Sequence, residues 1–167
     1  MEQMSVTCDI LINDARWDKR LDLDRLVHAA VAKAVEVTGV HLHPQAEASF
    51  SFADDERVRA LNVAWRMKNG PTNVLSFPAS QGTDLVKAPL LGDVILAYET
   101  VEREADEEGK DFANHTAHLI VHGFLHLIGY DHESDEEADV MESVESKVLL
   151  GLGMSDPWAI AIEARKD

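Results

Sequence analysis

The chain has 167 residues, of which 46% are hydrophobic and 28% are charged. This balance is typical of one soluble globular domain and excludes a disordered chain. The 15 basic and 31 acidic side chains give a formal net charge of −16, which argues against sequence-independent binding of DNA or another polyanion over the whole surface. A nucleic-acid partner must therefore use a local basic patch.

The cysteine content, the apolar runs and the first residues indicate the cellular compartment of the protein. Cys8 is the single cysteine, so the chain has no intramolecular disulfide framework. No apolar run has the length needed to cross a bilayer, and the first four residues lack the basic region of a signal peptide. We therefore expect a cytoplasmic protein without a membrane partner, folded as a single domain over residues 1–167.

Apolar patterns predict the secondary structure. Short alternating runs are typical of strands, and apolar residues at helical spacing that end at glycine are typical of helices. In the first strand, the alternation places Val6, Cys8, Ile10 and Ile12 on a buried face. The predicted strands span residues 5–13, 46–52, 72–78 and 91–97. The predicted helices span residues 22–39, 55–69, 99–108, 112–128 and 134–150, and a short one starts at residue 155.

The order of these elements indicates the fold class. Strands and helices are interleaved, but without the regular alternation of a doubly wound parallel sheet. We predict an α+β fold in which a four-stranded mixed sheet packs with about five helices. The long apolar helix of residues 112–128 is expected to lie against the sheet and to carry a metal site.

The stretch HGFLHLIGYDH at residues 122–132 predicts that metal site. His122 and His126 are four residues apart, so on a helix both rings can point at one ion. Gly129 falls where the helix would end in a left-handed turn, which would bring His132 back to the same ion. Three imidazoles leave the fourth position of zinc to a water molecule, as in catalytic sites. We predict one Zn²⁺ held by His122, His126 and His132.

A histidine on an apolar helix face is usually a packing residue, but the spacing of these three is specific. The same spacing, with its glycine, occurs in the zinc motif of the metzincin proteases. Those proteases have glutamate directly after the first histidine as general base, whereas this chain has Gly123. His118, four residues before His122, is expected to support the site or to pack beside it.

With these segments, the sequence resembles the YbeY family of zinc-dependent endoribonucleases. The resemblance covers most of the chain in one order. It runs from the helix with Leu61, Asn62 and Arg66, through the segments TNVLSFP at 72–78 and LGD at 91–93, to the histidine motif at 118–132. The chain departs from the family pattern at Asn73, where many members have aspartate, so the resemblance assigns no catalytic role to this side chain.

The resemblance implies a function and a site. The expected activity is cleavage of single-stranded RNA in ribosomal RNA maturation and ribosome quality control, in a bacterial cytoplasm. A ribosomal subunit or ribosomal protein is an expected partner, and DNA is not. By resemblance, His122, His126 and His132 match the zinc ligands and Arg66 matches a basic residue of the active-site cleft.

Other interpretations of the same residues remain open at the level of sequence. The motif is compatible with a metzincin-like peptidase, although Gly123 replaces its general base. It is also compatible with a non-enzymatic ribosome-assembly factor that zinc only stabilises. Arg66 can bind two phosphate oxygens with its guanidinium, or it can form a surface ion pair with Asp54 or Asp55.

Overall fold

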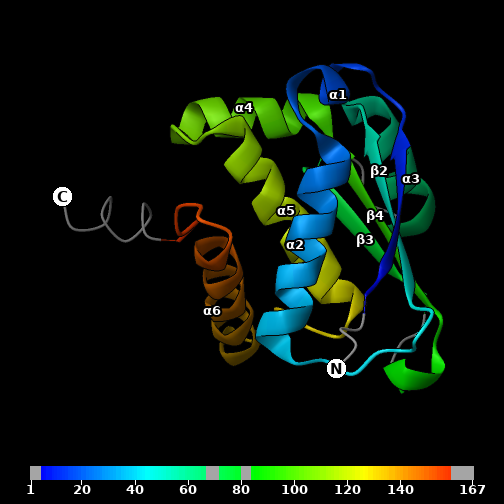
Figure 1. The fold of residues 1–167 in the computed structure, drawn as a ribbon. Coiled ribbons are helices and arrows are strands. Elements are labelled where there is room, and N and C mark those ends of the chain that lie inside the picture. The colour runs from blue at the N-terminus through cyan, green and yellow to red at the C-terminus, as the bar shows by residue number, and fades with distance from the viewer. Residues whose placement is uncertain (1–4, 67–71, 80–83, 159–167) are drawn as a thin grey trace.

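The computed structural model describes residues 5–66, 72–79 and 84–158, without the side chain of Arg66. Its strands form one sheet in the order β1, β2, β4, β3 (Figure 1). β1, β2 and β4 are parallel, whereas β3 pairs antiparallel with β4 and forms one edge. The predicted α+β fold with a four-stranded mixed sheet is confirmed. The strands span Thr7–Ile12 (β1), Glu47–Ala53 (β2), Val74–Pro78 (β3) and Leu90–Ala97 (β4).

Six α-helices accompany the sheet in the described part of the chain, together with a short 3₁₀ helix at Leu85–Lys87. The five main helices lie close to the predicted bounds. The α-helices are Arg16–Arg20 (α1), Leu23–Thr38 (α2), Asp55–Arg66 (α3), Tyr98–Glu108 (α4), Phe112–Leu127 (α5) and Asp135–Gly151 (α6).

Side chains at the helix ends explain these bounds. The Asp22 carboxylate accepts a hydrogen bond from the Arg25 N–H at the start of α2. Ser134 accepts one from the Glu137 N–H at the start of α6, in the predicted capping arrangement. Each bond satisfies a donor that the first helical turn leaves without an intrahelical partner.

The larger core lies between the sheet and the pair α2 and α5, with α6 packed on their outer side (Figure 1). Phe50, Phe52 and Val94 point from the sheet into this core and are fully buried. The opposite face of the sheet, at Leu75 and Ile95, is covered by α3 in a second, smaller cluster. The alternation of strand side chains thus places α5 and α3 on opposite faces of the β3 edge.

α5 lies very close to β4 at Gly123. A Cβ atom added there would lie 2.6 Å from Val94 Cγ1, which is closer than real side chains approach one another. A larger residue would have to push the helix away from the sheet or displace Val94 from a packed core. Glycine at this position therefore fixes how deeply the histidine-bearing helix sits on the sheet.

Three features differ from the sequence-based expectations. Ile12 was expected to be buried but is 45% exposed, because β1 is an edge strand and its inner face is only partly covered. α1 was missed. Its five residues show no apolar repeat, and it is held by the fully buried Trp17, whose ring nitrogen donates to the Ala53 carbonyl at 2.9 Å. The short helix expected from residue 155 lies largely outside the described residues.

Candidate metal centre

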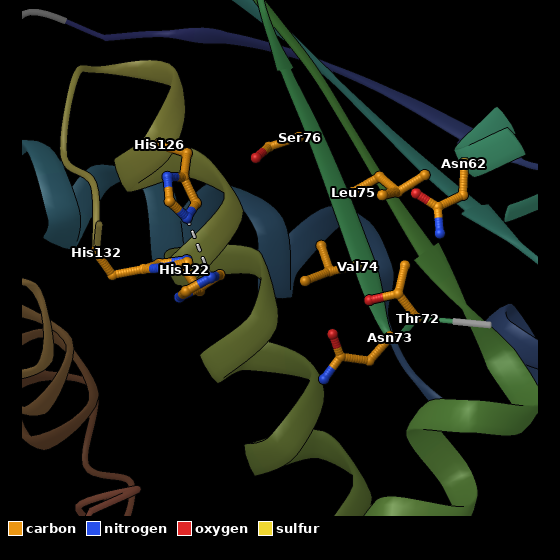
Figure 2. Close-up of a pocket in the computed structure, with 9 residues that line it drawn as sticks. All are labelled: Asn62, Thr72, Asn73, Val74, Leu75, Ser76, His122, His126 and His132. Atoms are coloured by element: carbon orange, nitrogen blue, oxygen red, sulfur yellow. Dashed lines mark hydrogen bonds between the residues drawn. The ribbon is translucent and has the colours of Figure 1, made fainter. Parts of the chain in front are cut away.

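α5 brings the first two histidines of the motif together. Asp111 caps the helix by accepting hydrogen bonds from the N–H groups of Ala113 and Asn114. One turn separates His122 from His126, and Figure 2 shows both rings on one side of α5, turned toward each other. Their Nε2 atoms are 3.2 Å apart.

The turn after α5 supplies the third histidine. Gly129 has a φ of +105°, which L side chains rarely adopt. The Tyr130 N–H donates to the Leu125 carbonyl at 2.9 Å and closes the helix end, so that the chain reverses. The ring of His132 then lies 4.9 Å from that of His126 and 5.6 Å from that of His122, measured between centroids.

The structure thus gathers the three predicted ligands at one point. One ligand atom of each residue lies within 4.8 Å of the others, and the group could hold a metal ion. Among the described residues, no other group of three histidine, cysteine or acidic side chains meets this condition. Three imidazole donors suit zinc and several other transition metals.

Hydrogen bonds fix which ring nitrogens face the centre. His122 Nδ1 lies 2.7 Å from a Glu145 carboxylate oxygen, and His126 Nδ1 lies 2.9 Å from the Tyr130 carbonyl. Both partners can only accept, so we assign the proton of each neutral ring to Nδ1. The two Nε2 atoms then present lone pairs to each other, an arrangement that a cation between them would stabilise.

The electrostatic surroundings favour the neutral, metal-binding form of His126. Burial, together with the neighbouring His122 and His132, lowers the pKa of His126 to about 4. At neutral pH its ring is therefore unprotonated and its Nε2 lone pair is available. A metal ligand needs this state, because a protonated imidazole cannot coordinate.

Glu145 of α6 lies behind the centre and was not predicted from the sequence. Its side chain is 1% exposed and accepts hydrogen bonds from His118 Nε2 and His122 Nδ1 at 2.7 Å, and from Trp158 Nε1 at 3.1 Å. Burial alone would raise the pKa of Glu145, but the bonds from the two histidines outweigh it and hold the pKa at about 2. Glu145 is thus a carboxylate that orients His122, a common arrangement behind metal ligands.

One signal in the sequence could have indicated Glu145. Met141, Glu145, Val148 and Leu149 share one face of α6 at helical spacing, and all four are buried. An acidic residue within such an apolar stripe requires a partner in the core. The sequence does not reveal that the partners are His118 and His122. His118 has the supporting position that was expected for it.

A cleft of about 250 Å³ opens beside the histidines (Figure 2). Strand β3 forms one wall, and Asn62 of α3 lines the cleft from the other side of that strand. The described lining residues carry amide, hydroxyl, imidazole and aliphatic groups but no carboxylate. They are Asn62, Thr72, Asn73, Val74, Leu75, Ser76, His122, His126 and His132.

Asn73 makes a hydrogen bond from the cleft wall that an aspartate carboxylate could not donate. Its Nδ2 donates to Glu104 Oε1 at 2.9 Å, and His115 Nε2 contacts the same oxygen at 2.9 Å. Burial raises the pKa of Glu104, but the bonds from His115 and Asn73 outweigh this effect and lower it. An aspartate at position 73 would set two carboxylates against each other, whereas asparagine supplies the needed donor.

The predicted role of Arg66 stays a prediction, because its side chain is outside the described part of the structure. Its backbone ends α3, one turn beyond the cleft residue Asn62. The alternative surface partners have other contacts. The Asp55 carboxylate accepts from the N–H and hydroxyl of Thr100, and the Asp54 carboxylate accepts from the Arg57 N–H.

Comparison with known proteins identifies the family. The family model described as endoribonuclease YbeY matches residues 11–153, which include all three candidate ligands, Glu145 and the cleft. The chain belongs to this family. The resemblance seen in the sequence is thereby confirmed.

Individual relatives agree with this assignment. An endoribonuclease YbeY of Azorhizobium caulinodans is 47% identical over 93% of this chain and 98% of its own length. One of Methylocella silvestris is 43% identical over 98% of this chain and 92% of its own length. The solution structure of a Thermotoga maritima protein has a TM-score of 0.55 and 21% identity over 90% of this chain and 98% of that protein, and it supports the fold alone.

We predict that Glu145→Gln weakens metal binding without unfolding the protein. A glutamine offers one acceptor where His118 and His122 each need one, so His122 must turn or move its proton to Nε2. Zinc affinity should fall by about 10- to 100-fold. Competition with a chelator of known affinity measures it, and circular dichroism checks the fold. Asp139→Asn, on the exposed side of the same helix, is the matched control. An equal loss in both variants, or none in Glu145→Gln, would contradict this role.

Proposed function

We propose that this chain is a zinc-dependent endoribonuclease that cuts single-stranded RNA. The composition of the cleft carries the proposal. Although acidic side chains outnumber basic ones by 31 to 15, the described residues that line the cleft include no carboxylate. Hydroxyl, amide and imidazole groups can approach a phosphodiester without the repulsion that the rest of the surface exerts. The membership in an endoribonuclease family supports RNA as the substrate.

Zinc is the proposed metal, and His122, His126 and His132 would hold it. When bound, zinc supplies a Lewis acid for the phosphodiester and a position for the attacking or leaving oxygen. Two hydrogen bonds orient the ligand rings: Glu145 fixes the ring of His122, and the Tyr130 carbonyl fixes the ring of His126. His132 is exposed and lines the cleft beside His122 (Figure 2).

The described residues of the site do not support a peptidase activity. Peptide hydrolysis at a zinc site of this kind uses a carboxylate as general base, and the position that carries it in metzincins is Gly123, packed against Val94. The described cleft residues offer no replacement carboxylate. A purely structural zinc is also disfavoured, since structural sites normally have four protein ligands.

The first test is His132→Ala. Because His132 is exposed, the variant should fold normally, lose most of its zinc and lose cleavage of single-stranded RNA. Elemental analysis of protein purified without added metal, thermal unfolding and cleavage assays measure the three effects. His28→Ala, an exposed histidine of α2, is the control.

Three outcomes would contradict the proposal. Wild-type protein that cuts casein and leaves single-stranded RNA intact would make it a peptidase. A variant that loses its fold together with its zinc would make the metal structural. About one equivalent of nickel or iron with little zinc would overturn the choice of metal.

Arg66 is proposed to bind the phosphate beside the metal. Its place one turn after Asn62 and the family resemblance support this role, and a guanidinium can hold two phosphate oxygens at once. In a chain of net charge −16, such a local cation would offset the long-range repulsion of RNA.

We predict that Arg66→Ala lowers single-turnover cleavage by about 100-fold or more, the usual cost of losing a donor to transition-state charge. Arg66→Lys should lose less, because it keeps the charge but not the two-pronged geometry. Zinc content and thermal unfolding should be unchanged in both. Arg57→Ala, an exposed arginine at the other end of α3, should cleave normally. Equal cleavage by wild type and Arg66→Ala would show that Arg66 does not bind the phosphate that is cut.

The proposed cellular role is maturation of ribosomal RNA and ribosome quality control in the cytoplasm. No helix among the described residues is long and apolar enough to span a membrane. An acidic enzyme approaches free RNA slowly, so a ribosomal subunit or ribosomal protein is the proposed route to the substrate.

In cells, His122→Ala should leave ribosomal RNA precursors with unprocessed ends. Sequencing of RNA termini in strains with the wild-type and variant chains measures this effect. Identical ribosomal RNA ends in the two strains would contradict the maturation role. They would not contradict the nuclease activity, which the cleavage assays test separately.

A further inference from the structure

α3 carries an apolar stripe that continues beyond the sheet. Val58 and Leu61 pack on Leu75 of β3 in the smaller core, and Val58 is fully buried. Trp65 follows Val58 by seven residues and therefore lies on the same face of the helix. Its side chain is nevertheless 72% exposed, the highest value among the exposed large hydrophobic residues of the described chain. The last turn of α3 thus presents an aromatic ring to solvent.

Trp65 is close along α3 to a residue that lines the cleft. Asn62, three residues before Trp65, lines the cleft and is only 6% exposed. Figure 2 shows the cleft residues extending from the histidines across β3 to Asn62 on the far side of the strand. Residues three apart on a helix are neighbours, so Trp65 lies beside a residue that lines the cleft, although it is not itself among the described lining residues.

We propose that Trp65 is a stacking platform for one nucleobase of the single-stranded substrate, beyond the phosphate that is cut. This inference rests on the proposed function and adds to it a residue that binds the base. An unpaired base can lay its flat face on an indole ring, whereas a base within a duplex has both faces covered by its neighbours. Trp65 therefore selects unpaired RNA and does so with little regard to sequence, because every base has an aromatic face.

The charge of the chain makes such a contact valuable. Proteins that bind single strands usually combine a basic groove with aromatic platforms. Here the net charge of −16 limits the electrostatic share, so stacking carries more of the binding. The other strongly exposed apolar side chains, such as Leu90 and Leu150 at 60% and 57%, are aliphatic and offer no aromatic face to a base.

The test is an abasic scan. A short fluorescent single-stranded RNA with non-cleavable linkages is prepared with one abasic nucleotide at each position in turn, and its affinity for the zinc-loaded protein is measured by anisotropy. With Trp65 present, one position should lose about 5- to 150-fold in affinity when its base is removed, the range of one base on an aromatic ring. In Trp65→Leu, affinity for intact RNA should fall by a similar factor, and removing that base should have no further effect.

Matched variants separate stacking from simple hydrophobic contact. Trp65→Phe keeps an aromatic face and should retain most of the affinity, whereas Trp65→Leu keeps an apolar side chain without one. Leu150→Ala, an exposed apolar residue of α6, should bind as the parent does. Equal affinity of the parent and Trp65→Leu, or an abasic penalty that persists in Trp65→Leu, would overturn the proposal and leave Trp65 as a contact for a protein partner.

Cleavage by enzymes with an intact metal centre distinguishes this proposal from the proposed function. Under single-turnover conditions, Trp65→Leu should need a higher enzyme concentration for half-maximal rate, with the maximal rate nearly unchanged. If the wild type fails to cleave RNA at all, the proposed function is wrong. If it cleaves and Trp65→Leu has the same concentration dependence, only the stacking role is wrong.

Discussion

The buried carboxylate of Glu145 is the interaction on which the centre depends. It accepts hydrogen bonds from His118, His122 and Trp158, so it links α5 to α6 and to the segment that follows α6. A buried charge is costly unless its partners are complete, and here three donors satisfy it. The same bonds that make Glu145 tolerable in the core direct His122 Nε2 toward the other two histidines. Stability of the core and geometry of the centre therefore have one physical cause.

The depth at which α5 sits on the sheet is a second constraint. Gly123 allows the helix to approach Val94, and this approach places His122 and His126 beside the edge strand β3. A glutamate at position 123, as in metzincin proteases, would have to enter the packed space between helix and sheet. Glycine thus accounts for the close packing and for the lack of a peptidase-type general base at that position.

The distribution of charge resolves an apparent conflict between composition and substrate. The chain has 31 acidic and only 15 basic side chains, yet the described cleft is free of carboxylates, and Asn73 donates to Glu104 from the cleft wall. The polar groups of the described residues that line the cleft are amide, hydroxyl and imidazole groups, which suits an anionic polymer at short range. Repulsion at long range disfavours non-specific association with nucleic acid.

The sequence by itself determined the α+β class, the four strands, the five main helices and the three histidines that meet. These features depend on local periodicity, helix caps and the spacing around Gly129, all of which act over a few residues.

Tertiary structure alone decided the rest. Helix α1 exists because Trp17 is buried by residues far along the chain, and Ile12 is exposed because its strand lies at an edge. The partnership of Glu145 with His122 joins residues 23 apart, and the place of Asn62 in the cleft depends on where α3 lies against β3. Such contacts are set by packing between elements, which no local pattern in the sequence specifies.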